Sequence, residues 1–326
     1  MKTDNDYLDS WQFRGVITSI IIAAIAYLSF SIWAGWEDVV SAFEMVGIHG
    51  FLIILGLSLV NYTLRFGRWQ IYLAALKHRI ALKPSSIIYF AGFALTTTPG
   101  KAGELLRGVF LQKRGVPYTA STAAFLSERL SDLFAITLLA SLGANLHKYG
   151  QFFIIGAVAV GICLSLLVFS NFLTLLRAKF ATKKNRLAKF ISHFLTLLSQ
   201  ARRCHTPVVL FFASILSLLA WAAEAYAFYL VLQWMGYNST IEFAFSVYAL
   251  SMLAGALSFL PGGLGGTEVV MAGLLIWAGI AETQAIAATV IIRLATLWFA
   301  VALGVAILTF SQHTLRDKTS RQDLHK

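Results

Sequence analysis

The sequence predicts an all-α polytopic membrane protein built as an inverted-topology repeat. Three observations predict this fold class. The 326 residues are 58% hydrophobic and only 13% charged, with a mean hydropathy of +0.73, whereas soluble domains carry about 25% charged residues. Several apolar runs are about 20 residues long, enough to cross a hydrocarbon core of about 30 Å. Two shorter apolar runs each end in Pro-Gly, and these two runs resemble each other.

Basic residues in the loops predict the orientation of the membrane spans. Lys2 and Arg14 precede the first span, and the formal net charge of +11 is concentrated in a few connections. Since cytoplasmic loops are enriched in Lys and Arg, we expect both termini to be cytoplasmic. The predicted spans are 16–34, 48–68, 119–146, 151–169, 207–233 and 285–310.

The run 85–98 is too short to be an ordinary span, and it precedes "PGKAGELLR". If it crossed the membrane, Lys101, Arg107, Lys113 and Arg114 would lie outside, against the positive-inside rule. We therefore predict a re-entrant helical hairpin over 85–115. A second hairpin over 243–281 turns at "PGGLGG". Non-helical backbone at membrane depth is tolerated where it is buried in protein or lines a cavity.

Two basic segments are predicted to lie on the cytoplasmic side. Residues 177–203 alternate basic and apolar positions with helical spacing, which predicts an interfacial amphipathic helix on anionic lipid headgroups. Residues 315–326 form a basic cytoplasmic tail.

An internal duplication relates the two hairpins. "FALTTTPG" and "GALSFLPG" place their prolines 261 − 99 = 162 residues apart. Beyond the turn, Glu104 matches Glu268 and Arg129 matches Arg293, both at an offset of 164. The repeats are predicted as 1–148 and 149–314. Each holds three spans, and because three is odd, the second repeat must be inverted relative to the first.

The hairpin turns are the first candidate site. Proline ends a helix and glycine permits positive φ, so the chain after each turn restarts as a half-helix whose N-terminus suits an anion such as a lipid phosphate. A structural helix break is the alternative. The turn residues are Pro99, Gly100, Gly103, Pro261, Gly262, Gly263, Gly265 and Gly266.

Charged residues near the turns are the second candidate set. Glu104 and Glu268 either cap the half-helices or bind a cationic headgroup or carry protons. Lys101 and Arg107 either hold phosphate oxygens or anchor the cytoplasmic side.

Charged residues inside the spans complete the set. The spacing in "SERLSD" places Glu128 and Asp132 on one helix face beside Arg129, where ionisable groups usually face the protein interior or a wet cavity. They either pair structurally, as Arg293 would with a hairpin glutamate, or take part in headgroup or proton movement. Glu224 is a lone carboxylate within 207–233.

Arg65 and Arg68 stand at the end of the second span. For these two arginines we favour snorkelling to the cytoplasmic interface.

Several function classes are excluded. The clustering of basic residues in loops argues against nucleic acid as a partner. A phosphate-binding loop would need Gly at Leu95 and Ser or Thr at Ala102. The seven histidines show no metal-ligand spacing, so we expect no metal and no cofactor, and Cys163 and Cys204 do not imply a disulfide framework.

Both Pro-Gly turns and the motifs "GELLR", "SERLSDL" and "LPGGLGGTEVVM" carry a resemblance to a known family. The chain resembles the family of the lysylphosphatidylglycerol synthase transmembrane region, also called flippase-like. The resemblance implies movement of a phospholipid or lipid-linked substrate between leaflets of the cell inner membrane. We expect a standalone member without the synthase domain, whose partners are membrane lipids, a separate lipid-modifying enzyme and a second copy of the chain. The lipid itself is not identified. The alternatives are an intramembrane enzyme or subunit acting on a lipid phosphate and an accessory membrane scaffold.

Overall fold

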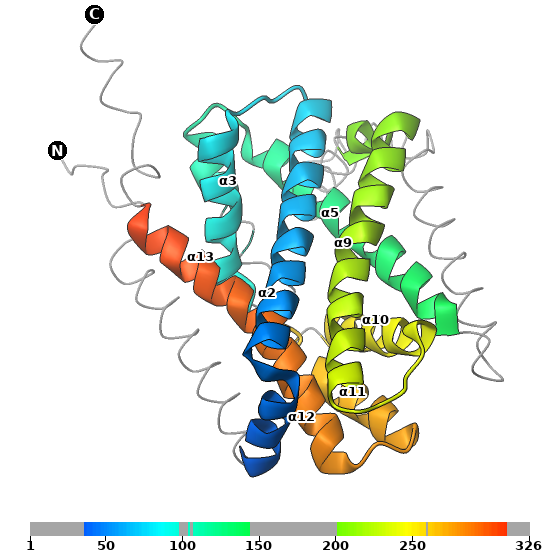
Figure 1. The fold of residues 1–326 in the computed structure, drawn as a ribbon. Helices are drawn as coiled ribbons and strands as arrows, with labels where there is room; N and C mark the ends of the chain where they lie inside the picture. Colours follow the sequence, from blue (N-terminus) through cyan, green and yellow to red (C-terminus); the bar gives the residue numbers. More distant parts are fainter. Residues whose placement is uncertain (1–35, 98–103, 105–106, 144–200, 259, 312–326) are drawn as a thin grey trace, which may run out of the picture.

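The computed structural model describes residues 36–97, 104, 107–143, 201–258 and 260–311. Every regular element within these ranges is helical (Figure 1). The predicted spans 16–34 and 151–169, the tail 315–326 and all but the last three residues of the amphipathic segment lie outside the described residues.

Two long helices form the centre of the molecule. Helix α2 (Trp36–Ala75) is kinked at Gly47, whose φ of +67° is a conformation that glycine adopts without strain. It therefore begins earlier than the predicted span 48–68. Helix α9 (Pro207–Trp234) starts with proline at its first turn, where the missing N–H costs nothing. The two run antiparallel and side by side (Figure 1).

Helix α5 (Tyr118–Ser141) crosses this pair obliquely and packs against α9 and α2 (Figure 1). A short 3-10 turn, η4 (Arg202–His205), precedes α9 and contacts α9, α5 and α2.

The last predicted span is one helix interrupted by a wider turn. Helix α12 (Glu282–Arg293) continues into the π-helical turn η5 (Leu294–Trp298) and then into α13 (Phe299–Phe310). The first part packs on α2 and α11, whereas α13 packs on α3 and η1. Gly304 allows the last contact, because a Cβ there would clash with the backbone of η1.

The segments predicted as hairpins consist of short helices that lie near opposite ends of the central pair (Figure 1). The first contains α3 (Leu82–Ala91), the 3-10 turn η1 (Gly92–Leu95) and α4 (Arg107–Gln112). The second contains α10 (Ile241–Leu257) and α11 (Gly266–Trp277). A Cβ on Gly262 would lie 3.4 Å from the Cα of Thr97, so the second Pro-Gly turn lies against the residues that follow η1.

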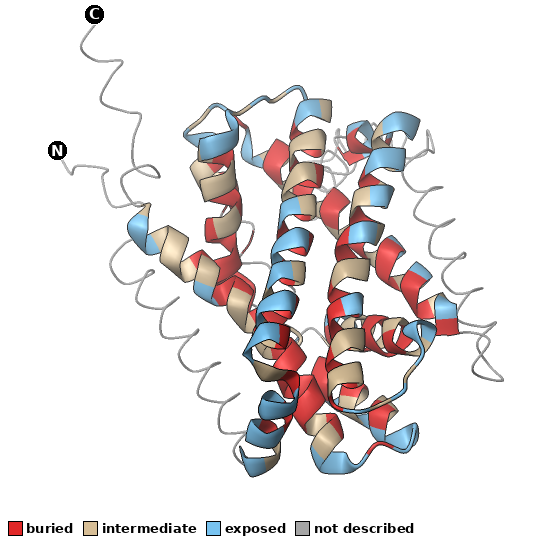
Figure 2. Ribbon diagram, viewed as in Figure 1, coloured by how far each residue is buried: buried red, intermediate tan, exposed pale blue. Residues whose placement is uncertain are grey.

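The outer surface is apolar. Three described helices are long and apolar enough to cross a membrane: 36–75, 207–234 and 282–310. Exposed residues lie along the outward faces of α2 and α9 (Figure 2). Many of them are large and apolar, including Leu52, Leu59, Val208, Phe211 and Leu219. Soluble monomers rarely expose such continuous apolar surface, so the protein is a multi-pass membrane protein.

Candidate functional site

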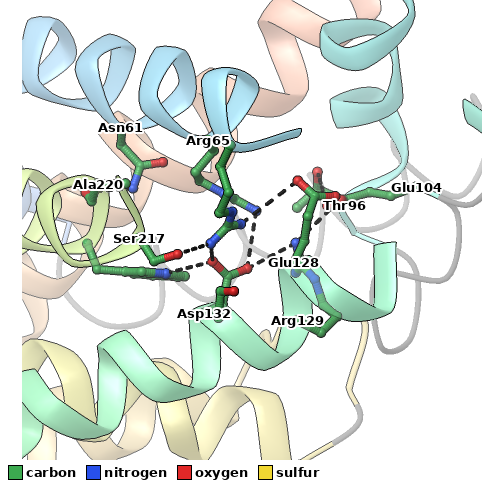
Figure 3. A network of polar contacts seen from close by, with 12 residues as sticks. Asn61, Arg65, Thr96, Glu104, Glu128, Arg129, Asp132, Ser217 and Ala220 are labelled. Carbon is green, nitrogen blue, oxygen red and sulfur yellow. Dashed lines mark hydrogen bonds and ion pairs between the residues drawn. The ribbon is translucent and has the colours of Figure 1, made fainter. Parts of the chain in front are cut away.

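Four arginines and three carboxylates, carried by α2, α4, α5 and the position of Glu104 before α4, meet inside the protein (Figure 3). We call this group the arginine cluster. Two of the arginines come from α2, and the others come from α4 and α5. The cluster consists of Arg65, Arg68, Glu104, Arg107, Glu128, Arg129 and Asp132, of which all but Arg129 are buried.

Arg68 is the most deeply placed of the four. Its side chain is 0% exposed, and its Nη1 donates to Asp132 Oδ1 at 2.7 Å and also to Ser217 Oγ. Trp221 Nε1 donates to the same aspartate oxygen at 3.0 Å. Because ionised partners make hydrogen bonds about twice as strong as neutral ones, Asp132 is held firmly against α2 and α9.

Arg107 joins the first hairpin to α5. Its Nη2 donates to Glu104 Oε2 and to Glu128 Oε2, both at 3.0 Å. Its Cζ lies 4.7 Å from the ring centroids of both Trp69 and Tyr89, within the range of a cation–π contact. These contacts hold the Arg107 guanidinium between two carboxylates and two aromatic rings.

Arg65 and Arg129 are held differently. Their Nη2 atoms lie 3.7 and 3.1 Å from Asp132 Oδ2, at ion-pair distance, and neither side chain donates a hydrogen bond to another described residue. Arg65 lies over Phe93 and Trp221, with its Cζ 6.0 and 5.8 Å from their ring centroids. Arg129 is 24% exposed, so it marks the side from which the cluster can be reached.

The prediction that Arg65 and Arg68 snorkel to the interface is wrong. Both are buried, at 6% and 0% exposure. The reason is that Glu128 and Asp132 on α5 face them, and paired charges can be buried where lone ones cannot. The sequence did contain the signal: two arginines three apart on one span and two carboxylates four apart on another each mark a single helix face.

The second hairpin carries a smaller buried pair. Glu268 Oε2 accepts from the backbone N–H of Gly265 at 2.7 Å, and its Oε1 accepts from Arg293 Nε at 2.6 Å. Arg293 Nη2 also donates to the carbonyl of Gly262 at 3.0 Å. Glu268 therefore caps α11 and pairs with the last span at the same time.

The two hairpins have equivalent pairs. Glu104 and Arg129 are 25 residues apart and form an ion pair at 3.7 Å. Glu268 and Arg293 are also 25 residues apart and form one at 2.6 Å. Both predicted structural pairings, Arg129 with Asp132 and Arg293 with a hairpin glutamate, are present.

Two further buried contacts join the spans: Glu224 accepts from Tyr248 Oη at 2.7 Å, and the hydroxyl of Tyr62 donates to the carbonyl of Thr296. All four residues are buried. The sequence analysis did not single out either tyrosine, because tyrosines within apolar spans carry no distinguishing pattern.

Four candidate residues, Pro99, Gly100, Lys101 and Gly103, lie outside the described residues. In the second turn, Gly262, Gly263 and Gly265 all have positive φ. Across the described ranges, no three His, Cys, Asp or Glu side chains are grouped for a metal ion.

The chain is similar to several UPF0104 membrane proteins. A UPF0104 membrane protein of Pyrococcus horikoshii is 23% identical over 320 residues, which cover 87% of this chain and 94% of the relative. A UPF0104 membrane protein of Methanothermobacter thermautotrophicus is 25% identical over 304 residues, covering 87% and 90%. The sequence profile of the lysylphosphatidylglycerol synthase TM region matches residues 16–304. That match spans most of the chain and includes both hairpins and all of the arginine cluster, and the chain therefore belongs to the family of the lysylphosphatidylglycerol synthase transmembrane region.

Proposed function

We propose that the protein moves a phospholipid or lipid-linked substrate between the leaflets of the cell inner membrane, through a site where the two hairpins meet. One observation carries the proposal: Thr97 and Gly262 lie against each other, and on each side a buried glutamate next to the turn, Glu104 or Glu268, pairs with an arginine 25 residues later in a span. Transporters place their sites at such repeat interfaces, on broken helices. Membership of a lipid-related family supports a lipid as the substrate.

The proposal includes an inverted repeat, with halves 1–148 and 149–314 and re-entrant hairpins 85–115 and 243–281. In this arrangement the halves rock about a central site. Arg129, Arg293 and Lys101 meet phosphate, and the carboxylates meet a cationic headgroup or carry protons. The carboxylates concerned are Glu104, Glu128, Asp132, Glu224 and Glu268.

Labelling from one side of the membrane tests the hairpins. In a variant without native cysteines, we expect Arg79→Cys and Lys113→Cys to react with an impermeant thiol reagent from the same side. Asn238→Cys and Glu282→Cys should both react from the other side. If 85–98 instead crosses the membrane, the first two positions will react from opposite sides, and the re-entrant arrangement is wrong.

Transport is tested with fluorescent lipid in proteoliposomes. Movement of the lipid to the other leaflet should be faster with the wild-type protein than in protein-free vesicles, and slower with Arg129→Ala or Arg293→Ala. Arg79→Ala is the matched control, because Arg79 is exposed and outside both pairs. Equal rates with and without wild-type protein would refute transport.

The same vesicles distinguish transport from intramembrane catalysis. A transporter leaves the mass of every lipid unchanged, whereas an enzyme acting on a lipid phosphate creates a new mass. Mass spectrometry of the lipids after incubation therefore decides between the two functions.

A further inference from the structure

The arginine cluster contains more hydrogen-bond donors than acceptors. Seven buried guanidinium nitrogens donate no hydrogen bond to any described residue, compared with one carboxylate oxygen, Asp132 Oδ2, that accepts none. Leaving a buried polar group unsatisfied costs about 1–3 kcal/mol, and more for a charged one. The seven are Nε and Nη2 of Arg65, Arg68 and Arg129, and Nη1 of Arg107.

Arg65, Arg68 and Arg129 each carry two of these nitrogens and Arg107 carries one, but the four arginines differ in the hydrogen bonds that they do donate. Arg68 and Arg107 donate to carboxylates at 2.7–3.0 Å and are fixed by them. Arg65 and Arg129 donate no hydrogen bond to any described residue, although Arg65 is only 6% exposed. An arginine carries five N–H groups in a planar fork, so most of the unused capacity lies on these two side chains.

Arg65 and Arg129 also approach the same atom. Each places its Nη2 within ion-pair distance of Asp132 Oδ2, at 3.7 and 3.1 Å, from helices α2 and α5 (Figure 3). The other oxygen of that carboxylate is already bound by Arg68 and Trp221. The positive charges of Arg65 and Arg129 therefore converge on Asp132 Oδ2, while Arg68 binds the other oxygen of the same carboxylate. An additional anion between Arg65 and Arg129 would reduce the repulsion between them.

The formal charge of the arginine cluster also favours an anion between Arg65 and Arg129. The cluster has four guanidinium groups and three carboxylates, an excess of one positive charge. Since an uncompensated charge in a low-dielectric interior is costly, a ligand with one negative charge fits the cluster better than a neutral or cationic one.

We propose that Arg65 and Arg129 bind the phosphate group of an anionic phospholipid headgroup beside Asp132. The planar guanidinium fork matches phosphate oxygens with two parallel hydrogen bonds, and a phosphodiester supplies the single negative charge. Arg68 and Arg107 hold the carboxylates in place and do not need to contact the ligand. The partial exposure of Arg129 gives the headgroup its entrance. This inference rests on the proposed function only in taking the ligand to be a lipid, since free phosphate offers the same oxygens.

Binding is tested on the full chain in dodecyl maltoside, by thermal-shift titration. The probes are dioleoylphosphatidylglycerol, dioleoylglycerol with the same acyl chains but no phosphate, and sodium phosphate against chloride at equal ionic strength. We expect phosphatidylglycerol to stabilise the wild-type protein and dioleoylglycerol not to. Stabilisation by inorganic phosphate alone, at similar affinity, would identify free phosphate as the ligand of the same site.

Variants then locate the site. Arg65→Gln and Arg129→Gln should each weaken phosphatidylglycerol binding by about tenfold or more, because each removes charge-assisted hydrogen bonds. Arg65→Lys keeps the positive charge that folding needs and removes the fork, so it tests the site even where Arg65→Gln does not fold. It should also bind more weakly than wild type. The matched control Arg79→Gln should bind like wild type.

The outcomes separate this site from transport. Unchanged affinity in Arg65→Lys and Arg129→Gln, or equal stabilisation by dioleoylglycerol, would overturn the phosphate site and leave lipid movement standing. Phosphate-dependent binding that requires both arginines, without lipid movement in proteoliposomes, would support the site while refuting transport.

Discussion

The pair of Glu268 and Arg293 fixes the second hairpin to the last span, and its removal should destabilise the protein strongly. Both side chains are at most 4% exposed, and they are joined at 2.6 Å. Breaking a buried ion pair by removing one partner costs about 3–5 kcal/mol, because the other charge stays buried and uncompensated. Arg293→Ala also releases the carbonyl of Gly262, so we expect a value at the upper end of that range.

A double-mutant cycle measures this contribution. At about 2–4 °C per kcal/mol, a loss of about 4–5 kcal/mol means that Arg293→Ala should lower the melting temperature in detergent by roughly 8–20 °C. Glu268→Ala should do the same and, in addition, lose the cap of α11, worth about 1 kcal/mol. Because the double variant leaves no unpaired charge, its loss should be smaller than the sum of the two by at least about 2 kcal/mol.

The control and the refuting result are both measurable. Arg203→Ala removes an exposed arginine and should shift the melting temperature by no more than about 2 °C. If Arg293→Ala behaves like this control, or if the two single losses add up to the double loss, then the buried pair does not hold the hairpin and the reasoning is refuted.

Three further variants test other contacts. Arg68→Met leaves Asp132 with weaker compensation and should cost about 3–5 kcal/mol, measured by thermal unfolding. Gly304→Ala should destabilise by about 1–3 kcal/mol through overpacking against η1, whereas Gly56→Ala, with open space around it, should be neutral or slightly stabilising. Burial lowers the pKa of His205, so the folded protein binds this proton less readily than the unfolded chain, and its free energy of unfolding should fall as the pH drops from about 7 to 5; His205→Gln should flatten that dependence.

The spans and hairpin arms could be predicted from the sequence because their signals are local. Apolar runs bounded by charge or Pro-Gly predicted α9 within one residue, both ends of α5 within five, and the start of α10 within two. The start of α2 at Trp36 was not predicted, because the predicted span began only at residue 48; Glu37 and Asp38 in its first turn suit a helix N-terminus.

The arginine cluster was predicted only in part. Glu128, Arg129 and Asp132 were identified as interior residues because charge within a span is costly. Arg65 was assigned to the interface, because its position near a span end fits snorkelling equally well. Arg65 is buried because α5 packs against α2. Residue spacing within one span cannot predict this contact between two helices.

The π-helical turn η5 has a consequence for helical phase. An α-helix turns by about 100° per residue, and a π-turn accommodates one extra residue. The turn therefore rotates α13 relative to α12, so that a single continuous span presents Arg293 to one hairpin and Gly304 to the other. Deleting one residue between 294 and 298 would restore a regular helix and turn one half by about 100°. The protein would then lose either the bonds of Arg293 to Glu268 and Gly262 or the close contact of Gly304 with η1. One regular helix cannot place both residues correctly.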